Sequence, residues 1–309
     1  MPSEPAPHEH PSPPTDKRGR LVAALASLVV GVALLITKLV AWRLTGSAAV
    51  LSDALEGIVN VAAAGFALYS VYLSDKPPDL DHPYGHGKVE FLSAGFEGGL
   101  IFLAGGLILH ESIDRLIVGG ELQRIGLGLI LITGAAVVNL LLGLYLIRVG
   151  KRTGSLTLVA DGKHLLTDVW TSGASVVALV AVWLTSFGWL DPVIAILAAL
   201  NILRIGAGLF REAVKGIMDT ADPDDLAKVS RLLQAVDHPL FRGWARLRAR
   251  HQGALHHVDF VLYVPDDTTV AEGHGLADHV EAVIVDGLGQ AEVICHVEPE
   301  SLRIIARPP

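Results

Sequence analysis

Six apolar stretches, each at least 21 residues long, dominate the first 215 residues of this 309-residue chain. A helix of about 20 apolar residues spans the roughly 30 Å hydrocarbon core of a bilayer. We therefore predict a membrane protein with six helical spans, and a soluble enzyme is excluded. The predicted spans are Leu21–Leu44, Ala48–Leu73, Val89–Leu109, Ile125–Val149, Leu156–Leu184 and Leu190–Phe210.

The net charge of the chain is concentrated at its end. Residues 219–309 hold 15 acidic and 8 basic side chains, which account for seven of the eight net negative charges. We predict a disordered, proline-rich tail over 1–20, a transport-type membrane domain over 21–215 and a water-soluble domain over 216–309. The negative charge argues against nucleic-acid partners. The single cysteine, Cys295, excludes a disulfide framework.

Lysine and arginine near the span ends predict the orientation of the membrane domain. Ten of them fall on one side of the membrane and three on the other. Because the more basic side of a membrane protein faces the cytoplasm, we predict that both termini and the acidic domain are cytoplasmic. The expected location is a bacterial inner membrane.

The soluble domain has the element order helix, strand, strand, helix, strand. Along the first strand, Ala245, Leu247 and Ala249 alternate with three arginines and are expected to share its apolar face. This αββαβ order predicts a small α+β domain of the ferredoxin-like type. The expected elements are Pro223–Val236, Trp244–Arg250, Val258–Val264, Thr269–Val285 and Val293–Val297.

Two spans carry matched triplets of polar residues, which are costly inside a membrane and therefore indicate function. Each triplet has spacings of three and four, so its members lie on one face of a helix. Together the two faces can surround a divalent cation with carboxylate, imidazole and amide ligands. The alternative is that these groups pair across helices to fix packing, or cap helix ends. Glu97 in the third span is expected to be mainly a packing or interfacial group. The triplets are Asp53, Glu56 and Asn60, and Asp161, His164 and Asp168.

Further candidate ligands lie outside the spans. The loop after the second span places Asp79, Asp81, His82 and His86 within eight residues, among prolines and glycines that prevent a regular helix. This loop is a second predicted metal site. The alternative, a solvated turn, would explain the prolines, glycines and aspartates equally well but not the paired histidines. The soluble domain offers a third group of weaker candidates: His256, His257, Asp259, His274, Asp278, His296 and Glu298.

Three motifs resemble the cation diffusion facilitator family of metal transporters. They are GSAAVLSDALEGIVNVAAA, HPYGHGKVE and DGKHLLTDVWTS, and the resemblance is collinear over about residues 20–303. It implies a homodimer with six membrane helices and a cytosolic ferredoxin-like domain in each protomer. It also implies exchange of cytoplasmic Zn²⁺, or another divalent metal, for protons by alternating access.

The resemblance assigns roles to individual positions. It implies that Glu56, Asn60, His164 and Asp168 form the transport site. Asp53 and Asp161 are nearer the span ends, and from that position we expect them to line an entrance. The resemblance places a second metal site at Asp79, His82 and His86, a charged dimer interlock at Lys88 and Asp219, and regulatory zinc at His274, His296 and Glu298. No resident cofactor is implied, since the metal is the substrate.

Two departures from the family pattern affect these expectations. Many zinc transporters have His or Asp in place of Glu56 and Asp in place of Asn60, so Mn²⁺ or Fe²⁺ become alternative substrates. Ala245 and Val261 stand where the bacterial pattern has histidines. The cytosolic binuclear site is therefore expected to be depleted, or rebuilt with His256, His257 or Asp259.

Metal binds deprotonated His and carboxylate side chains, so metal binding releases protons. We therefore predict that metal transport is coupled to proton transport. His164 and Asp168 are the expected proton carriers, because an unperturbed histidine titrates near pH 6.5. The rival functions are a membrane-tethered metal sensor without flux, a membrane hydrolase and a passive channel. No arrangement of Ser, Cys or Lys nucleophiles supports an enzyme.

Overall fold

The computed structural model describes residues 16–45, 48–118, 128–185 and 187–303. The described chain divides after Met218 into two units, a helical one from Asp16 and a mixed one from Asp219 onward. Residues 1–15 of the predicted tail lie outside the described residues, whereas Lys17–Arg20, which were predicted to belong to the tail, form the start of helix α1.

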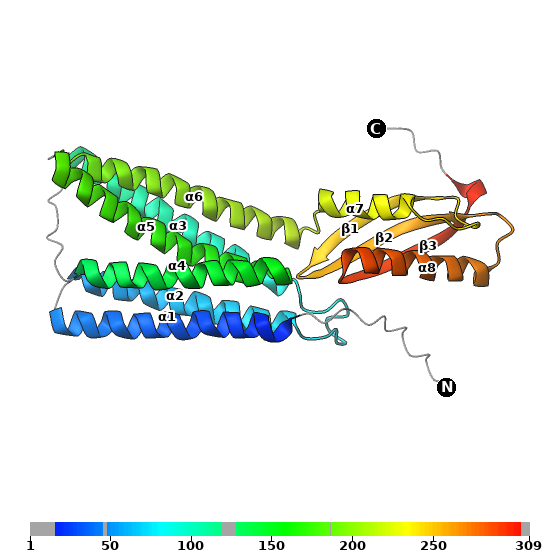
Figure 1. The fold of residues 1–309 in the computed structure, drawn as a ribbon, viewed down its shortest axis with the longest axis horizontal. Helices are drawn as coiled ribbons and strands as arrows, with labels where there is room; N and C mark the ends of the chain where they lie inside the picture. Colours follow the sequence, from blue (N-terminus) through cyan, green and yellow to red (C-terminus); the bar gives the residue numbers. More distant parts are fainter. Residues whose placement is uncertain (1–15, 46–47, 119–127, 186, 304–309) are drawn as a thin grey trace. The chain divides into compact units, whose positions relative to one another are not determined.

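Six long helices form the first unit and lie side by side (Figure 1). By length and hydropathy, five of the described helices can cross a membrane, with spans inside α1, α2, α3, α4 and α6. The remaining long helix, α5, carries Asp161, His164 and Asp168 in its first half. The predicted membrane fold class is confirmed. The helices are α1 Lys17–Thr45, α2 Ala48–Ser74, α3 Val89–Val118, α4 Gly128–Thr153, α5 Leu156–Thr185 and α6 Leu190–Ile217.

Some helices differ in length from the predicted spans. Helix α3 continues nine residues beyond the expected end at Leu109, and α6 continues from Phe210 to Ile217. In α3, i,i+4 ion pairs hold this polar extension, with Arg115 Nη2 2.9 Å from Glu111 Oε1. The first three residues of the predicted fourth span, 125–127, lie outside the described residues.

Glycines allow α3 and α6 to approach each other closely. A Cβ atom on Gly206 would lie 2.6 Å from the backbone nitrogen of Phe102, and one on Gly98 would lie 2.8 Å from that of Phe210. Real Cβ atoms do not come so near to backbone atoms. Small residues therefore set the spacing of this helix pair, as is common between membrane helices.

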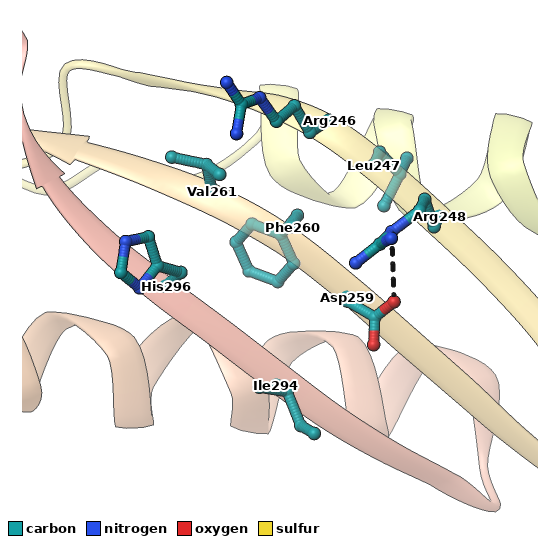
Figure 2. Close-up of a pocket in the computed structure, with 8 residues that line it drawn as sticks. All are labelled: Arg246, Leu247, Arg248, Asp259, Phe260, Val261, Ile294 and His296. Carbon is teal, nitrogen blue, oxygen red and sulfur yellow. Dashed lines mark ion pairs between the residues drawn. The ribbon is translucent and has the colours of Figure 1, made fainter. Parts of the chain in front are cut away.

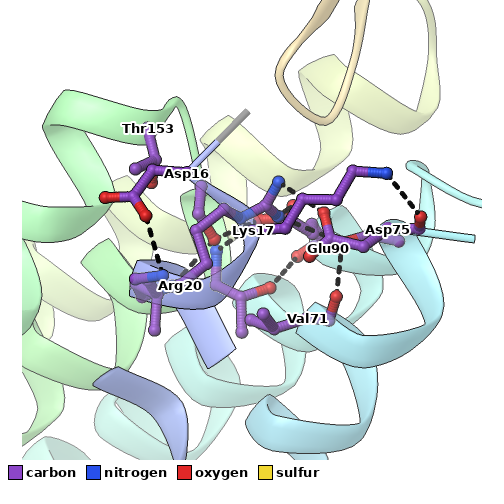
Figure 3. Close-up of polar contacts among 12 residues, drawn as sticks. Asp16, Lys17, Arg20, Val71, Asp75, Glu90 and Thr153 are labelled. Carbon is purple, nitrogen blue, oxygen red and sulfur yellow. Dashed lines mark hydrogen bonds and ion pairs between the residues drawn. The ribbon is translucent and has the colours of Figure 1, made fainter. Parts of the chain in front are cut away.

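A buried ionic cluster joins the ends of several helices (Figure 3). Arg20 of α1 pairs with the fully buried Glu90 of α3 and, at 3.0 Å, with Asp75 after α2. The second carboxylate oxygen of Glu90 accepts hydrogen bonds from Ser155 Oγ and the backbone N–H of Thr157. These contacts compensate a carboxylate that would otherwise be costly to bury.

The second unit has two layers, a three-stranded sheet with two helices on one face (Figure 1). The strand order is β1-β2-β3, with β1 antiparallel and β3 parallel to β2. The core joins Val229 and Leu233 of α7 to Phe260 and Leu262 of β2 and to Leu276 of α8. The predicted αββαβ order is confirmed. The elements are α7 Pro223–Gln234, β1 Gly243–Gln252, β2 Leu255–Val264, α8 Val270–Leu288 and β3 Ala291–Pro299, followed by a 3₁₀ turn Glu300–Leu302.

A β-bulge in β1 interrupts the predicted alternation of apolar and basic side chains. Arg246 has a φ of 54°, and the register with β2 shifts between Ala245 and Arg248. The extra residue reverses the side-chain faces before that point. Trp244, rather than Ala245, therefore packs against the core together with Leu247 and Ala249.

Candidate metal centres

Helices α2 and α5 bring three of the predicted transport-site residues, Asn60, His164 and Asp168, into one hydrogen-bonded set that we call the α2–α5 group. His164 Nε2 lies 3.1 Å from Asn60 Oδ1, and Asn60 Nδ2 donates to Asp168 Oδ2 at 3.2 Å. His164 is buried, with 8% of its surface exposed, and the other two residues are partly buried. An imidazole, an amide and a carboxylate thus meet between two helices.

The side chains of Asp53 and Glu56 lie outside those that the structure describes. Both residues belong to α2, and Asn60 follows Glu56 by one helical turn. The predicted membership of Glu56 in the transport site, and the entrance role of Asp53, stay predictions.

Two further carboxylates are buried in the same helical unit. Asp161 lies one turn before His164 on α5 and is 2% exposed, while Glu97 of α3 is fully buried. Neither oxygen of Glu97 has a hydrogen-bond partner in the described part of the chain, and neither does Oδ2 of Asp161. Glu97 interacts electrostatically with Asp161 and Asp168. It therefore belongs to the acidic surroundings of the α2–α5 group.

The loop between α2 and α3 gathers the second predicted site. Asp79 Oδ1 lies 3.1 Å from His82 Nδ1, and Asp79 Oδ2 lies 3.3 Å from His86 Nε2. The three ligand atoms all lie within 4.8 Å of one another. Asp81 supplies its backbone N–H to Asp79 Oδ1 rather than a carboxylate to the group.

Backbone geometry prepares Asp79 to bind a cation. Its Oδ1 accepts the N–H of His82 at 2.7 Å. This hydrogen bond is the main reason that the pKa of Asp79 is lowered, with the His82 ring adding to it. The carboxylate is therefore ionised at neutral pH, as metal ligation requires.

The structure does not gather His274, His296 and Glu298 within one protomer. His296 Nε2 lies 3.4 Å from Glu298 Oε1 on β3, whereas His274 lies on α8, 3.6 Å from Asp278. Neither pair belongs to the two groups of three or more ligands found among the described residues. Their predicted role at a dimer interface stays a prediction.

The face of the sheet opposite the helices holds a hollow of about 550 Å³ beside the bulge in the middle of β1 (Figure 2). Val261 and Ile294 line it, and His296 is the only histidine among its lining residues. Asp259 lies 3.3 Å from Arg248 Nε. A carboxylate paired with arginine is a weak candidate ligand, so rebuilding the binuclear site with Asp259 is not supported here.

His257 and His256 point to different partners. His257 Nε2 lies 3.1 Å from Gln252 Oε1 and its Nδ1 lies 3.2 Å from Glu292 Oε2. Burial lowers the pKa of His257 despite the nearby Glu292 carboxylate. His256 instead contacts Asp225 of α7, with Nδ1 2.8 Å from Oδ2.

The group to which His256 belongs was not predicted from the sequence. Asp225, His251 and His256 place their ligand atoms within 4.8 Å of one another. Burial lowers the pKa of His251, and the neighbouring His256 lowers it further. A signal was available: His251 and His256 stand symmetrically about Gly253–Ala254, as expected for a cross-strand pair in a hairpin. The contribution of Asp225 depends on the tertiary fold.

The predicted interlock between Lys88 and Asp219 joins different units. Lys88 precedes α3, and Asp219 begins the second unit with a φ of 53°. Within that unit, Arg250 donates to Asp219 Oδ2 at 3.2 Å. The Lys88–Asp219 contact stays a prediction.

Two family models match consecutive parts of this chain. The cation efflux transmembrane domain matches residues 24–218, and the cytoplasmic domain of cation efflux proteins matches residues 221–300. The two matches meet near the structural division after Met218.

Curated relatives match the chain almost end to end. An uncharacterised transporter, sll1263, of Synechocystis sp. is 37% identical over 283 residues, covering 91% of each chain. The cation-efflux pump FieF of Klebsiella pneumoniae is 32% identical over 92% of this chain and 95% of its own. A solved structure described as the zinc form of CzrB is 27% identical and covers 28% of this chain and 97% of its own, with a TM-score of 0.27. The chain belongs to the cation efflux, or cation diffusion facilitator, family of membrane transporters.

Proposed function

We propose that this cation efflux transporter exports Zn²⁺ from the cytoplasm in exchange for protons, as a homodimer in the inner membrane with both termini cytoplasmic. The observation that carries the proposal is the α2–α5 group of Asn60, His164 and Asp168. Glu56, one turn before Asn60, supplies the fourth ligand in this proposal.

The hydrogen-bond pattern explains how metal and protons compete. Asn60 donates its amide N–H to Asp168, so its Oδ1 faces His164 and can only accept. Nε2 of His164 therefore donates to this oxygen. Coordination through Nε2 requires that its hydrogen leave this nitrogen, and a His164 protonated on both nitrogens, or a protonated Asp168, cannot bind metal. Metal and the additional proton therefore compete for the α2–α5 group.

The ligand chemistry favours zinc over harder cations. A histidine with carboxylates suits Zn²⁺, whereas Ca²⁺ and Mg²⁺ prefer oxygen-only sites. The amide oxygen of Asn60 is a harder ligand than imidazole, and Mn²⁺ and Fe²⁺ are the alternative substrates. Competition among metals for uptake distinguishes them.

The experiment compares two histidine variants in membrane vesicles. His164→Ala is expected to abolish metal flux, because it removes both a ligand and a proton carrier. His110→Ala is the matched control, because His110 lies on the exposed end of α3 and contacts only Asp114 among its described ion-pair partners. Flux that persists in His164→Ala would refute the site. No flux in the wild-type protein, with metal binding found only in the cytosolic domain, would favour the sensor function.

A further inference from the structure

The end of the β1–β2 hairpin presents two histidines to the first turn of α7. His251 and His256 are direct cross-strand partners, and their ring centroids lie 4.4 Å apart. The turn between them includes Gly253 with a φ of 63°. Asp225 is the third residue of α7, whose N-cap is Asp222. We call Asp225, His251 and His256 the α7–hairpin cluster.

The distances in the α7–hairpin cluster are those of a compact ligand set. Asp225 Oδ2 lies 2.7 Å from His251 Nε2 and 2.8 Å from His256 Nδ1. Neighbouring ligands around a tetrahedral zinc ion lie about 3.4 Å apart, given metal–ligand bonds of about 2.0–2.2 Å. Small side-chain rotations would therefore open space for an ion.

The surroundings supply a further oxygen and access from solvent. The side chains of the cluster are 14–29% exposed, so they are held by packing and still reachable. Asp222 uses Oδ1 to cap the N–H of Asp224, while its Oδ2 lies 3.9 Å from His251 Nε2. A fourth position is thus available to this carboxylate or to water.

We propose that the α7–hairpin cluster is a metal site for Zn²⁺ or a similar borderline transition metal, bound through two imidazole nitrogens and one carboxylate. Two imidazoles with one carboxylate suit such metals and not Ca²⁺ or Mg²⁺. None of the three residues belongs to the positions that the family resemblance assigns to metal, except that His256 was a candidate for a rebuilt interface site. Here His256 pairs with α7 instead.

Metal at this position would stabilise the segment 219–225, where the chain enters the second unit. Asp222 is the fourth residue after Met218, where the membrane unit ends. The ion pair between Arg250 and Asp219 already ties this segment to β1. A metal ion would add a second tie from α7 to both strands of the hairpin. Occupancy therefore reduces local opening of residues 219–225.

The test counts bound metal on the full-length protein in detergent after chelator treatment. Cobalt is the probe, because tetrahedral Co²⁺ absorbs visible light strongly and substitutes for zinc. Wild-type protein is expected to bind one more equivalent of Co²⁺ per protomer than His251→Gln or Asp225→Asn. His279→Gln is the matched control, since this histidine contacts the ring of His238 at 6.0 Å and lies outside the cluster.

The two cluster variants keep the test decisive. Far-UV circular dichroism and gel filtration establish whether each variant is folded. If His251→Gln misfolds, Asp225→Asn still provides the test, because this substitution hardly changes the side-chain volume. Equal cobalt counts and spectra in wild type, Asp225→Asn and His279→Gln would overturn the proposal and leave a purely hydrogen-bonded cluster. The count does not depend on flux, so failure of the transport function would not alter this result.

Discussion

At the scale of single residues, Cys295 shows how the core of the second unit controls the reactivity of a thiol. Its side chain packs against the core of the second unit. Burial raises the pKa of the thiol to about 12, and the charge of Glu281 contributes to the rise. Since the thiolate is the reactive form, this cysteine is expected to be a packing residue rather than a metal or redox group.

Alkylation rates test this assignment. At pH 8 a thiol with a pKa near 12 is about 10⁻⁴ ionised, whereas an ordinary cysteine with a pKa of about 8.5 is about a quarter ionised. Iodoacetamide should therefore modify Cys295 at least about 100-fold more slowly than the thiol introduced by Val270→Cys, at an exposed position. The rate for Cys295 should rise with pH. Equal rates at the two positions would contradict this account.

A second prediction concerns the buried pair of Arg20 and Glu90. Glu90→Gln removes one of the two carboxylates that pair with a guanidinium that is 2% exposed, which should destabilise the protein by about 3 kcal/mol. Glu111→Gln is the control on the same helix. Its pair with Arg115 is exposed, so its loss should cost less than about 0.5 kcal/mol. Thermal unfolding in detergent checks the difference, and similar midpoints for the two variants would be inconsistent with it.

Locality decided which site residues the sequence could predict. Asp79, His82 and His86 lie within eight residues, and the structure gathers them. The α2–α5 group was identifiable because polar side chains are costly in apolar spans. Asp225 gave no such signal, since acidic residues are common in the first turn of a helix. Only the packing of α7 against the hairpin brings it to the two histidines of the α7–hairpin cluster.

At the scale of elements, close helix packing is the feature that most restricts substitution. Gly206 lies against the α3 backbone, whereas Gly208, two residues later, has open space where a Cβ would be. Hydropathy predicted both helices but could not distinguish these two glycines. The β1 bulge at Arg246 was likewise invisible to a strict period of two, so the prediction for Ala245 was wrong.

The two glycines form a matched pair of substitutions. Gly206→Ala should separate α3 from α6 and cost about 1–3 kcal/mol through overpacking. Gly208→Ala should leave stability unchanged or raise it slightly, because alanine is the better helix former. Thermal unfolding in detergent measures both. A larger loss of stability in Gly208→Ala than in Gly206→Ala would contradict the close packing of α3 against α6 at Gly206.

At the scale of the whole molecule, the chain joins a membrane transport unit to a second unit with its own core. The sequence predicted both units, because apolar length and charge distribution differ between them. Sites that need a second protomer depend on more than the residues of one chain. The expected dimer roles of Lys88, Asp219, His274, His296 and Glu298 belong to that level.

In the proposed mechanism, metal and protons exchange at the α2–α5 group. The most direct measurement is metal uptake into proteoliposomes under an imposed pH gradient, comparing Zn²⁺ with Mn²⁺, Fe²⁺, Co²⁺ and Cd²⁺. We expect Zn²⁺ uptake that follows the proton gradient and collapses when a protonophore dissipates it. Uptake that ignores the proton gradient, or no uptake of any metal by folded protein, would contradict the proposed antiport.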